Sequence, residues 1–199
     1  MRNQDNLIFV EGFSMTELLV VISIVGILSA LAIPSFQSAS STNRISTAVN
    51  SLHGALLLAR TEAIKRNKNV TICRSETANY STPTCSTTNS LATSNSGWAD
   101  GWIVFTDENN NGTYQPTSTP PDILILAQGK LSKNLDDISI IPNTSRKYIT
   151  FGPTGQTFGT FIQFGINRPN WDTETSHDRY ICIASGGRAR VSTSPCGGV

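Results

Sequence analysis

The side chains best able to do chemistry in this sequence are four cysteines, Cys73, Cys85, Cys182 and Cys196. None forms a Cys-x-x-Cys pair, which argues against a zinc ribbon or a thioredoxin-type redox site. Four cysteines allow three pairings, and proximity in sequence favours the two local bridges, Cys73–Cys85 and Cys182–Cys196. We therefore predict a disulfide-bonded protein outside the cytoplasm. The alternative is four buried thiols in a cytosolic protein.

Glu17 is a carboxylate placed at the start of an apolar segment. A helix from Phe13 to Ile33, about 21 residues, is about 31 Å long and can cross a bilayer core. An unpaired carboxylate within it would cost roughly 2.5 kcal/mol. If the chain is cut after Gly12, the new amine of Phe13 lies one helical turn from Glu17. Both this amine and the helix N-terminus would then stabilise the carboxylate.

An ordinary secretory signal is the alternative interpretation of this N-terminus. Cleavage after Ala32 would release a secreted, disulfide-bonded β protein. However, the segment before the apolar run carries Asp5, Glu11 and Glu17 and only Arg2 as a basic residue. Secretory signals have a positive first region, so the charge pattern argues against this alternative.

Two arginines near the C-terminus are spaced for phosphate binding. The segment from Tyr180 to Cys196 predicts a β-hairpin that turns at the Gly186-Gly187 pair. Because side chains alternate along a strand, Arg188 and Arg190 are expected on one face, about 7 Å apart.

Such a pair can contact successive phosphates of double-stranded DNA. A Cys182–Cys196 bridge would hold the hairpin, with Ala189 and Val191 on the opposite face. In the alternative interpretation, the arginines only solvate a surface strand or pair with Asp172 or Asp178.

The segment from Asp107 to Gly112 begins like a calcium-binding EF-hand loop. Its twelfth position is Ser118 rather than a bidentate Glu, and its flanks predict strands, so we interpret it as a polar hairpin turn. The sequence has two histidines, His53 and His177, and no nucleophile elbow, His-Glu-x-x-His or phosphate loop. We expect no enzymatic activity, no metal and no cofactor.

The elements that must position these residues follow from composition and periodicity. Charged residues make up 15% of the 199, against roughly 25% on average, and a net charge of +1 excludes a strongly basic nucleic-acid binder. The helix is expected to kink at Pro34 and continue to residue 68, with His53 as a packing or surface residue on it. Apolar residues at three- and four-residue steps predict its buried face: Ile45, Ala48, Val49, Leu52, Leu56, Ala59 and Ala63.

From Asn69 onward the period switches to two, which predicts antiparallel strands joined by Gly, Pro and Asn turns. We expect residues 76–97, rich in Ser, Thr and Asn, to form an exposed, mobile loop. The predicted strands are Val70–Cys73, Trp102–Thr106, Ile123–Ala127, Ile138–Ile141, Tyr148–Phe151, Phe158–Ile166, Tyr180–Ala184 and Arg188–Thr193.

The segment Gly12-Phe13-Ser-Met-Thr-Glu17-Leu-Leu-Val-Val-Ile resembles the processing signal of type IV prepilins and type II secretion pseudopilins. The resemblance implies cleavage between Gly12 and Phe13 by a prepilin peptidase and N-methylation of Phe13. It also implies that Glu17 neutralises the N-terminal amine of a neighbouring subunit during filament assembly. Glu11, in a leader that is not basic, departs from the usual pattern and bears on processing efficiency.

The order of elements resembles the pilin-like fold, an α+β fold with a long N-terminal helix packed on an antiparallel β domain. Two segments, Val70–Arg74 and Gly101–Asp107 followed by Asn111-Gly112, resemble the GspH/FimT family. This family includes minor pilins of the FimT and FimU kind and the type II secretion pseudopilin GspH. Gly187-Arg188-Ala-Arg190 resembles the Gly-Arg-x-Arg element of FimT minor pilins that bind DNA in natural transformation.

Together these resemblances imply a minor pilin of a type IV pilus that helps to start or assemble the filament and binds DNA through the arginine hairpin. The alternative within the family is a minor pseudopilin of a type II secretion system. The implied partners are other pilins, the prepilin peptidase and the inner membrane, which the chain crosses once with its β domain periplasmic. The implied organisation is a leader at 1–12, a transmembrane and filament-core helix at 13–33, an amphipathic helix at 34–68 and a β domain at 69–199.

Overall fold

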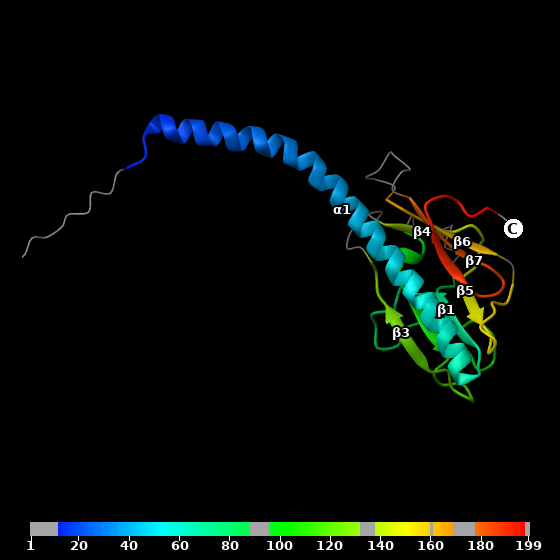
Figure 1. Cartoon of the computed structure of the whole chain (residues 1–199). Helices are drawn as coiled ribbons and strands as arrows, with labels where there is room; N and C mark the ends of the chain where they lie inside the picture. Colours follow the sequence, from blue (N-terminus) through cyan, green and yellow to red (C-terminus); the bar gives the residue numbers. More distant parts are fainter. Residues whose placement is uncertain (1–11, 88–95, 132–137, 160, 169–177, 198–199) are drawn as a thin grey trace, which may run out of the picture. The chain divides into compact units, whose positions relative to one another are not determined.

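The computed structural model describes residues 12–87, 96–131, 138–159, 161–168 and 178–197 (Figure 1). The side chains at 31–38 and 41 lie outside this description. The chain divides into two units, Met1–Ser40 and Ser41–Val199, and helix α1 (Met15–Arg66) contributes to both.

In the first unit, helix α1 presents apolar side chains at consecutive positions. Leu18, Leu19, Val20, Val21 and Ile22 are each between 51% and 58% exposed, so apolar surface covers the whole circumference rather than one stripe. The helix is continuous through Pro34, and a kink there stays a prediction. No helix that the structure describes combines the length and the apolar content needed to cross a membrane.

In the second unit, α1 buries one face against the β domain. The seven apolar residues predicted from the helical period are all buried, and Ala55 joins them. The helix ends in a Schellman motif, in which Lys68 N–H donates to Ala63 O at 3.2 Å and Asn67 N–H to Ile64 O at 3.3 Å. Asn67 adopts a left-handed φ of 52°, which asparagine tolerates better than most residues.

The β domain contains two four-stranded antiparallel sheets rather than one. The first has the order β3-β2-β1-β5 and the second the order β4-β6-β7-β8. The bounds of the first are β1 (Val70–Arg74), β2 (Trp102–Thr106), β3 (Leu124–Gln128) and β5 (Tyr148–Phe151). Those of the second are β4 (Ser139–Pro142), β6 (Ile162–Asn167), β7 (Arg179–Ile183) and β8 (Ala189–Ser192).

A short 3-10 helix, η1 (Trp98–Asp100), links the two sheets. Gly97, which precedes it, forms an isolated bridge with Ile140 of β4. The rings of Trp98 and Phe164 meet edge to face, with centroids 5.1 Å apart. Because Trp98 and Phe164 are fully buried in the main core with the face of α1, η1 fixes how the second sheet meets the helix.

The two central strands of the first sheet, β1 and β2, are buried on both faces. Val70 and Ile72 belong to the main core, whereas Cys73 and Phe105 belong to a smaller core on the opposite face. Ala78 is buried in this smaller core, so the predicted exposed loop at 76–97 is in part a cover for the sheet. Residues 88–95 lie outside the described chain.

All eight predicted strands are present, and the largest difference in bounds concerns β6. The alternation predicts Phe158–Ile166, and the strand runs over Ile162–Asn167. Phe158 instead donates its N–H to Thr150 O at 3.1 Å, and Gly159 has a φ of 119°. A left-handed φ of this kind interrupts an extended strand, so residues 157–159 cover the edge of β5.

Candidate functional site

The N-terminus of α1 is closed by a capping box. Ser14 precedes the first helical residue, and its Oγ accepts a hydrogen bond from Glu17 N–H at 3.3 Å. In return, Glu17 Oε2 accepts from Ser14 N–H at 3.5 Å. This reciprocal pattern satisfies two backbone donors that a helix N-terminus otherwise leaves unpaired. The carboxylate predicted to need a partner therefore has one within its own chain.

The Gly12–Phe13 bond lies in exposed chain without regular secondary structure, immediately before this cap. The Phe13 side chain is 84% exposed. A bond in this setting is open to a peptidase, and the residues before it, 1–11, lie outside the described chain.

The C-terminal arginines lie on a hairpin formed by β7 and β8. Cys182 pairs with Arg190 and Ile183 with Ala189 across the two strands. Arg188 and Arg190 are exposed and Ala189 between them is buried, as alternation predicts. No described residue forms an ion pair with either guanidinium; Asp172, one of the two predicted partners, lies outside the described residues.

The turn of this hairpin is anchored to the rest of the domain. Gly187 has a φ of 73°, and a Cβ added there would lie 1.9 Å from Gly155 O, so only glycine fits. Thr157 N–H donates to Ser185 O at 3.0 Å on the neighbouring segment. At the other end of the loop, His53 Nε2 of α1 lies 3.4 Å from Ala189 O. The arginines are thus held on a fixed support.

Both disulfides join the cysteines that are neighbours in sequence. The Cys73–Cys85 bridge has a sequence separation of 12 and the Cys182–Cys196 bridge one of 14. Cys196 N–H also donates to Gln163 Oε1 at 2.7 Å. The second bridge therefore fastens the C-terminal segment across β7 and β6, beside the arginine hairpin.

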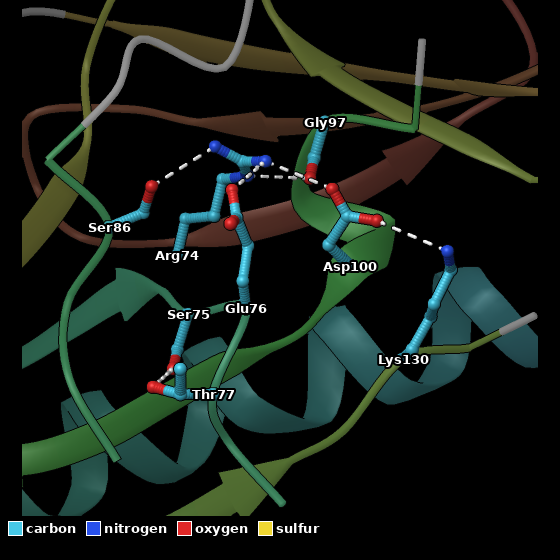
Figure 2. Close-up of polar contacts among 8 residues, drawn as sticks. All are labelled: Arg74, Ser75, Glu76, Thr77, Ser86, Gly97, Asp100 and Lys130. Atoms are coloured by element: carbon cyan, nitrogen blue, oxygen red, sulfur yellow. Dashed lines mark hydrogen bonds and ion pairs between the residues drawn. The ribbon is translucent and has the colours of Figure 1, made fainter. Parts of the chain in front are cut away.

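Arg74 forms the densest polar network in the described chain (Figure 2). Its side chain is 2% exposed. Nε donates to Gly97 O at 2.8 Å, and Nη2 donates to Glu76 Oε1 at 2.7 Å and to Asp100 Oδ2 at 2.9 Å. Nη1 donates to Ser86 Oγ at 3.2 Å. The guanidinium therefore joins β1, the disulfide loop and η1.

The turn after β2 is built around the buried carboxylate of Asp107. Its Oδ2 accepts from Thr71 Oγ1 at 2.8 Å and from Gly112 N–H at 2.9 Å, while Oδ1 accepts from Asn111 N–H at 3.0 Å. These bonds describe a polar turn between two strands. Burial, followed in size by the charge of Asp122, raises the pKa of Tyr114 in the same loop. Across the described residues, no three His, Cys, Asp or Glu side chains gather as metal ligands would.

The family model of the type II transport protein GspH matches residues 48–192. The chain belongs to the GspH family. The match covers the C-terminal part of α1, from Ala48 onward, and the β domain up to the end of β8. No curated protein matches the chain.

The GspH-family chain has the pilin fold seen in a solved relative. It superimposes on the crystal structure of the type IV minor pilin FimU from Pseudomonas aeruginosa with a TM-score of 0.53 and 16% identity, over 75% of this chain and 89% of that chain. A second crystal form of FimU gives a TM-score of 0.45 at 16% identity, over 74% and 91% of the two chains. At this identity the likeness concerns the α+β fold, a long helix packed on antiparallel sheets.

Sequence reasoning missed two side-chain contacts in this GspH-family chain. The first is the capping box, although the Ser14-x-x-Glu17 spacing is its known signature. The second is the network of Arg74, whose partners Gly97 and Asp100 lie more than twenty residues away in sequence. A pattern of neighbouring residues cannot predict contacts between side chains so far apart in sequence.

Proposed function

We propose that this protein is a minor subunit of a type IV pilus-like filament, with a structural role in starting or assembling it. The prepilin peptidase would cut between Gly12 and Phe13, and Phe13 would then be N-methylated. Residues 13–33 would anchor the subunit in the inner membrane before assembly. The β domain would lie in the periplasm, where both disulfides can form.

The exposed apolar surface of the first unit carries this proposal. An isolated helix that is apolar all round is not stable in water and must be covered by lipid or by other helices. In a filament, the corresponding helices of neighbouring subunits supply that cover. The second half of α1 does not need it, because its apolar face is already buried on its own β domain.

The family supports two filament systems. The matching family model is that of a type II transport protein, and the solved structure with the same fold is a type IV minor pilin. The rigid arginine hairpin favours the pilus, because DNA capture is a task for a filament that reaches outside the cell. Type II secretion is the second candidate.

A deletion strain separates the two systems. If the protein is a pilus subunit, the deletion is expected to reduce twitching and natural transformation at least tenfold and to leave exoprotein secretion unchanged. Complementation with the full gene controls for effects on neighbouring genes. Loss of secretion with normal twitching would assign the chain to the secretion system instead.

We also propose that Arg188 and Arg190 bind double-stranded DNA during uptake. Both guanidinium groups are exposed and have no ion-pair partner among the described residues. The turn at Gly187 and the Cys182–Cys196 bridge hold them in place. A fixed pair of cations loses little conformational entropy when it contacts successive phosphates.

Replacing both arginines by alanine is expected to weaken duplex binding by the full chain in an uncharged detergent. Loss of two phosphate contacts would reduce the slope of log K against log salt concentration by about 1.8. Fluorescence anisotropy between low and moderate salt measures this slope. Lys65→Ala/Arg66→Ala is the matched control, because it removes two exposed charges that already pair with Glu62. An equal loss of affinity in this control would show that binding depends on the net charge of the chain and not on Arg188 and Arg190.

A further inference from the structure

A second candidate site lies on the face of the first sheet that is turned away from α1. There a hollow of about 430 Å³ is lined by seven residues, a volume within the roughly 300–1,000 Å³ range of small-ligand sites. Its position follows from register, because Tyr148 pairs with Cys73, and Cys73 belongs to the outer core. The lining residues are Asn110, Ser145, Arg146, Lys147, Tyr148, Thr150 and Phe158.

The hollow carries two positive charges that no carboxylate of the described chain neutralises. Arg146 Nη1 donates to Phe158 O at 3.0 Å, and Lys147 Nζ donates to Thr87 O, so both anchors are neutral carbonyls. The acidic groups in the adjoining turn are already engaged. Glu108 pairs with Lys68 at 2.7 Å, and Asp107 accepts three hydrogen bonds within its own turn and from β1.

Two exposed aromatic rings accompany these charges. Tyr148 is 43% and Phe158 54% exposed. Each ring rests on a glycine: a Cβ added to Gly112 would lie 2.4 Å from Tyr148 Cζ, and one added to Gly152 would lie 3.3 Å from Phe158 Cζ. The glycines let the rings lie close against the backbone, which limits their motion and leaves apolar surface facing the hollow.

We propose that this hollow binds single-stranded nucleic acid, with Arg146 and Lys147 contacting phosphates and Tyr148 and Phe158 stacking on unpaired bases. Sites for single strands combine cations that follow the backbone with aromatic rings on which bases stack. In a duplex the base faces are covered, so the rings could contribute only to single-strand binding. The site is distinct in residues and in ligand from the duplex contact proposed for Arg188 and Arg190.

The test uses the full chain in an uncharged detergent and a fluorescently labelled twelve-nucleotide oligothymidine. Tyr148→Leu/Phe158→Leu keeps apolar contact with the glycines but removes stacking, and it is expected to weaken binding roughly tenfold or more. Arg146→Gln/Lys147→Gln is expected to reduce the salt slope by about 1.4, or 0.7 for each phosphate. Tyr80→Leu is the matched control, because Tyr80 is 68% exposed and does not line the hollow.

The same variants are measured against a duplex of matched length, where the loss from Tyr148→Leu/Phe158→Leu is expected to stay below twofold. Three outcomes would overturn the proposal: no binding of the oligothymidine at low salt, unchanged binding by the leucine variant, or equal losses on single strand and duplex. Arg188→Ala/Arg190→Ala separates the two sites. If that variant alone abolishes single-strand binding, the hollow is not the site and the hairpin proposal still stands.

Discussion

Replacing Arg74 by methionine is expected to lower the free energy of unfolding by roughly 3 kcal/mol or more. Methionine fills part of the space but cannot pair with the Asp100 carboxylate, whose side chain is 12% exposed. Asp100 loses the contact with Arg74 at 2.9 Å and keeps the longer contact with Lys130 at 3.7 Å. It also removes the donor to the Gly97 carbonyl. Removing one partner of a buried charge pair takes away the closer of the two cations that face the Asp100 carboxylate, and this is what makes the loss large.

The measurement is urea unfolding of the oxidised full chain in detergent, followed by far-UV circular dichroism. Arg66→Met is the matched control, since Arg66 forms an exposed i, i+4 pair with Glu62, and such pairs contribute at most about 0.5 kcal/mol. Arg74→Lys should lie between the two, because it keeps the charge and loses the guanidinium fork. Equal midpoints for the Arg74→Met and Arg66→Met variants would show that the network adds nothing to stability.

Replacing Glu17 by valine is expected to reduce incorporation into sheared filaments at least tenfold, with the subunit still processed and present in the membrane fraction. On the proposed function, the carboxylate must leave its capping bond with Ser14 and neutralise the amine of a neighbouring subunit. Valine removes the charge and the cap together. Immunoblots of filament and membrane fractions measure the ratio.

Two further variants separate the charge of Glu17 from its role in the cap. Glu17→Gln keeps an oxygen that can accept from Ser14 N–H but has no charge, so it should fail like valine. Ser14→Ala removes the other half of the capping box and keeps the charge, so it should assemble. If glutamine assembles normally, the carboxylate acts only as a cap.

N-terminal sequencing of the mature chain must accompany these assays. A first residue of Phe13 is the expected result. A first residue of Ile33 would instead support the secreted β protein released by a signal peptidase.

The helix and the strands could be predicted from the sequence because each one depends on a pattern of residues within its own segment. The predicted strand Trp102–Thr106 coincides with β2, and the spacing of Ile45 to Ala63 identifies the buried face of α1. The pairing of cysteines also follows from proximity. In these cases the signal lies within a few residues of the feature that it predicts.

The arrangement of these elements could not be predicted in the same way. The residue pattern of β4 and β6 does not predict that these two strands pair with each other in a second sheet. Pairing depends on contacts between segments that are distant in sequence. Arg74 illustrates the same limit. Arginine is usually exposed, and it is buried here because acceptors from three separate segments surround it. The hollow beside Tyr148 likewise joins segments that are distant in sequence: the turn after β2, the chain that leads into β5 and the segment after β5.

The short span of both disulfides has a kinetic consequence on the proposed function, in which the protein is oxidised while its N-terminal helix is held in the membrane. Closing a loop of 12 or 14 residues costs about 2 kcal/mol less than closing one of roughly 100 residues, as a bridge between Cys85 and Cys182 would require. The native pairs are therefore favoured roughly twentyfold even in an unfolded chain. The correct disulfides can therefore form before the two sheets assemble and without rounds of disulfide exchange. On the proposed function, this step does not depend on filament assembly.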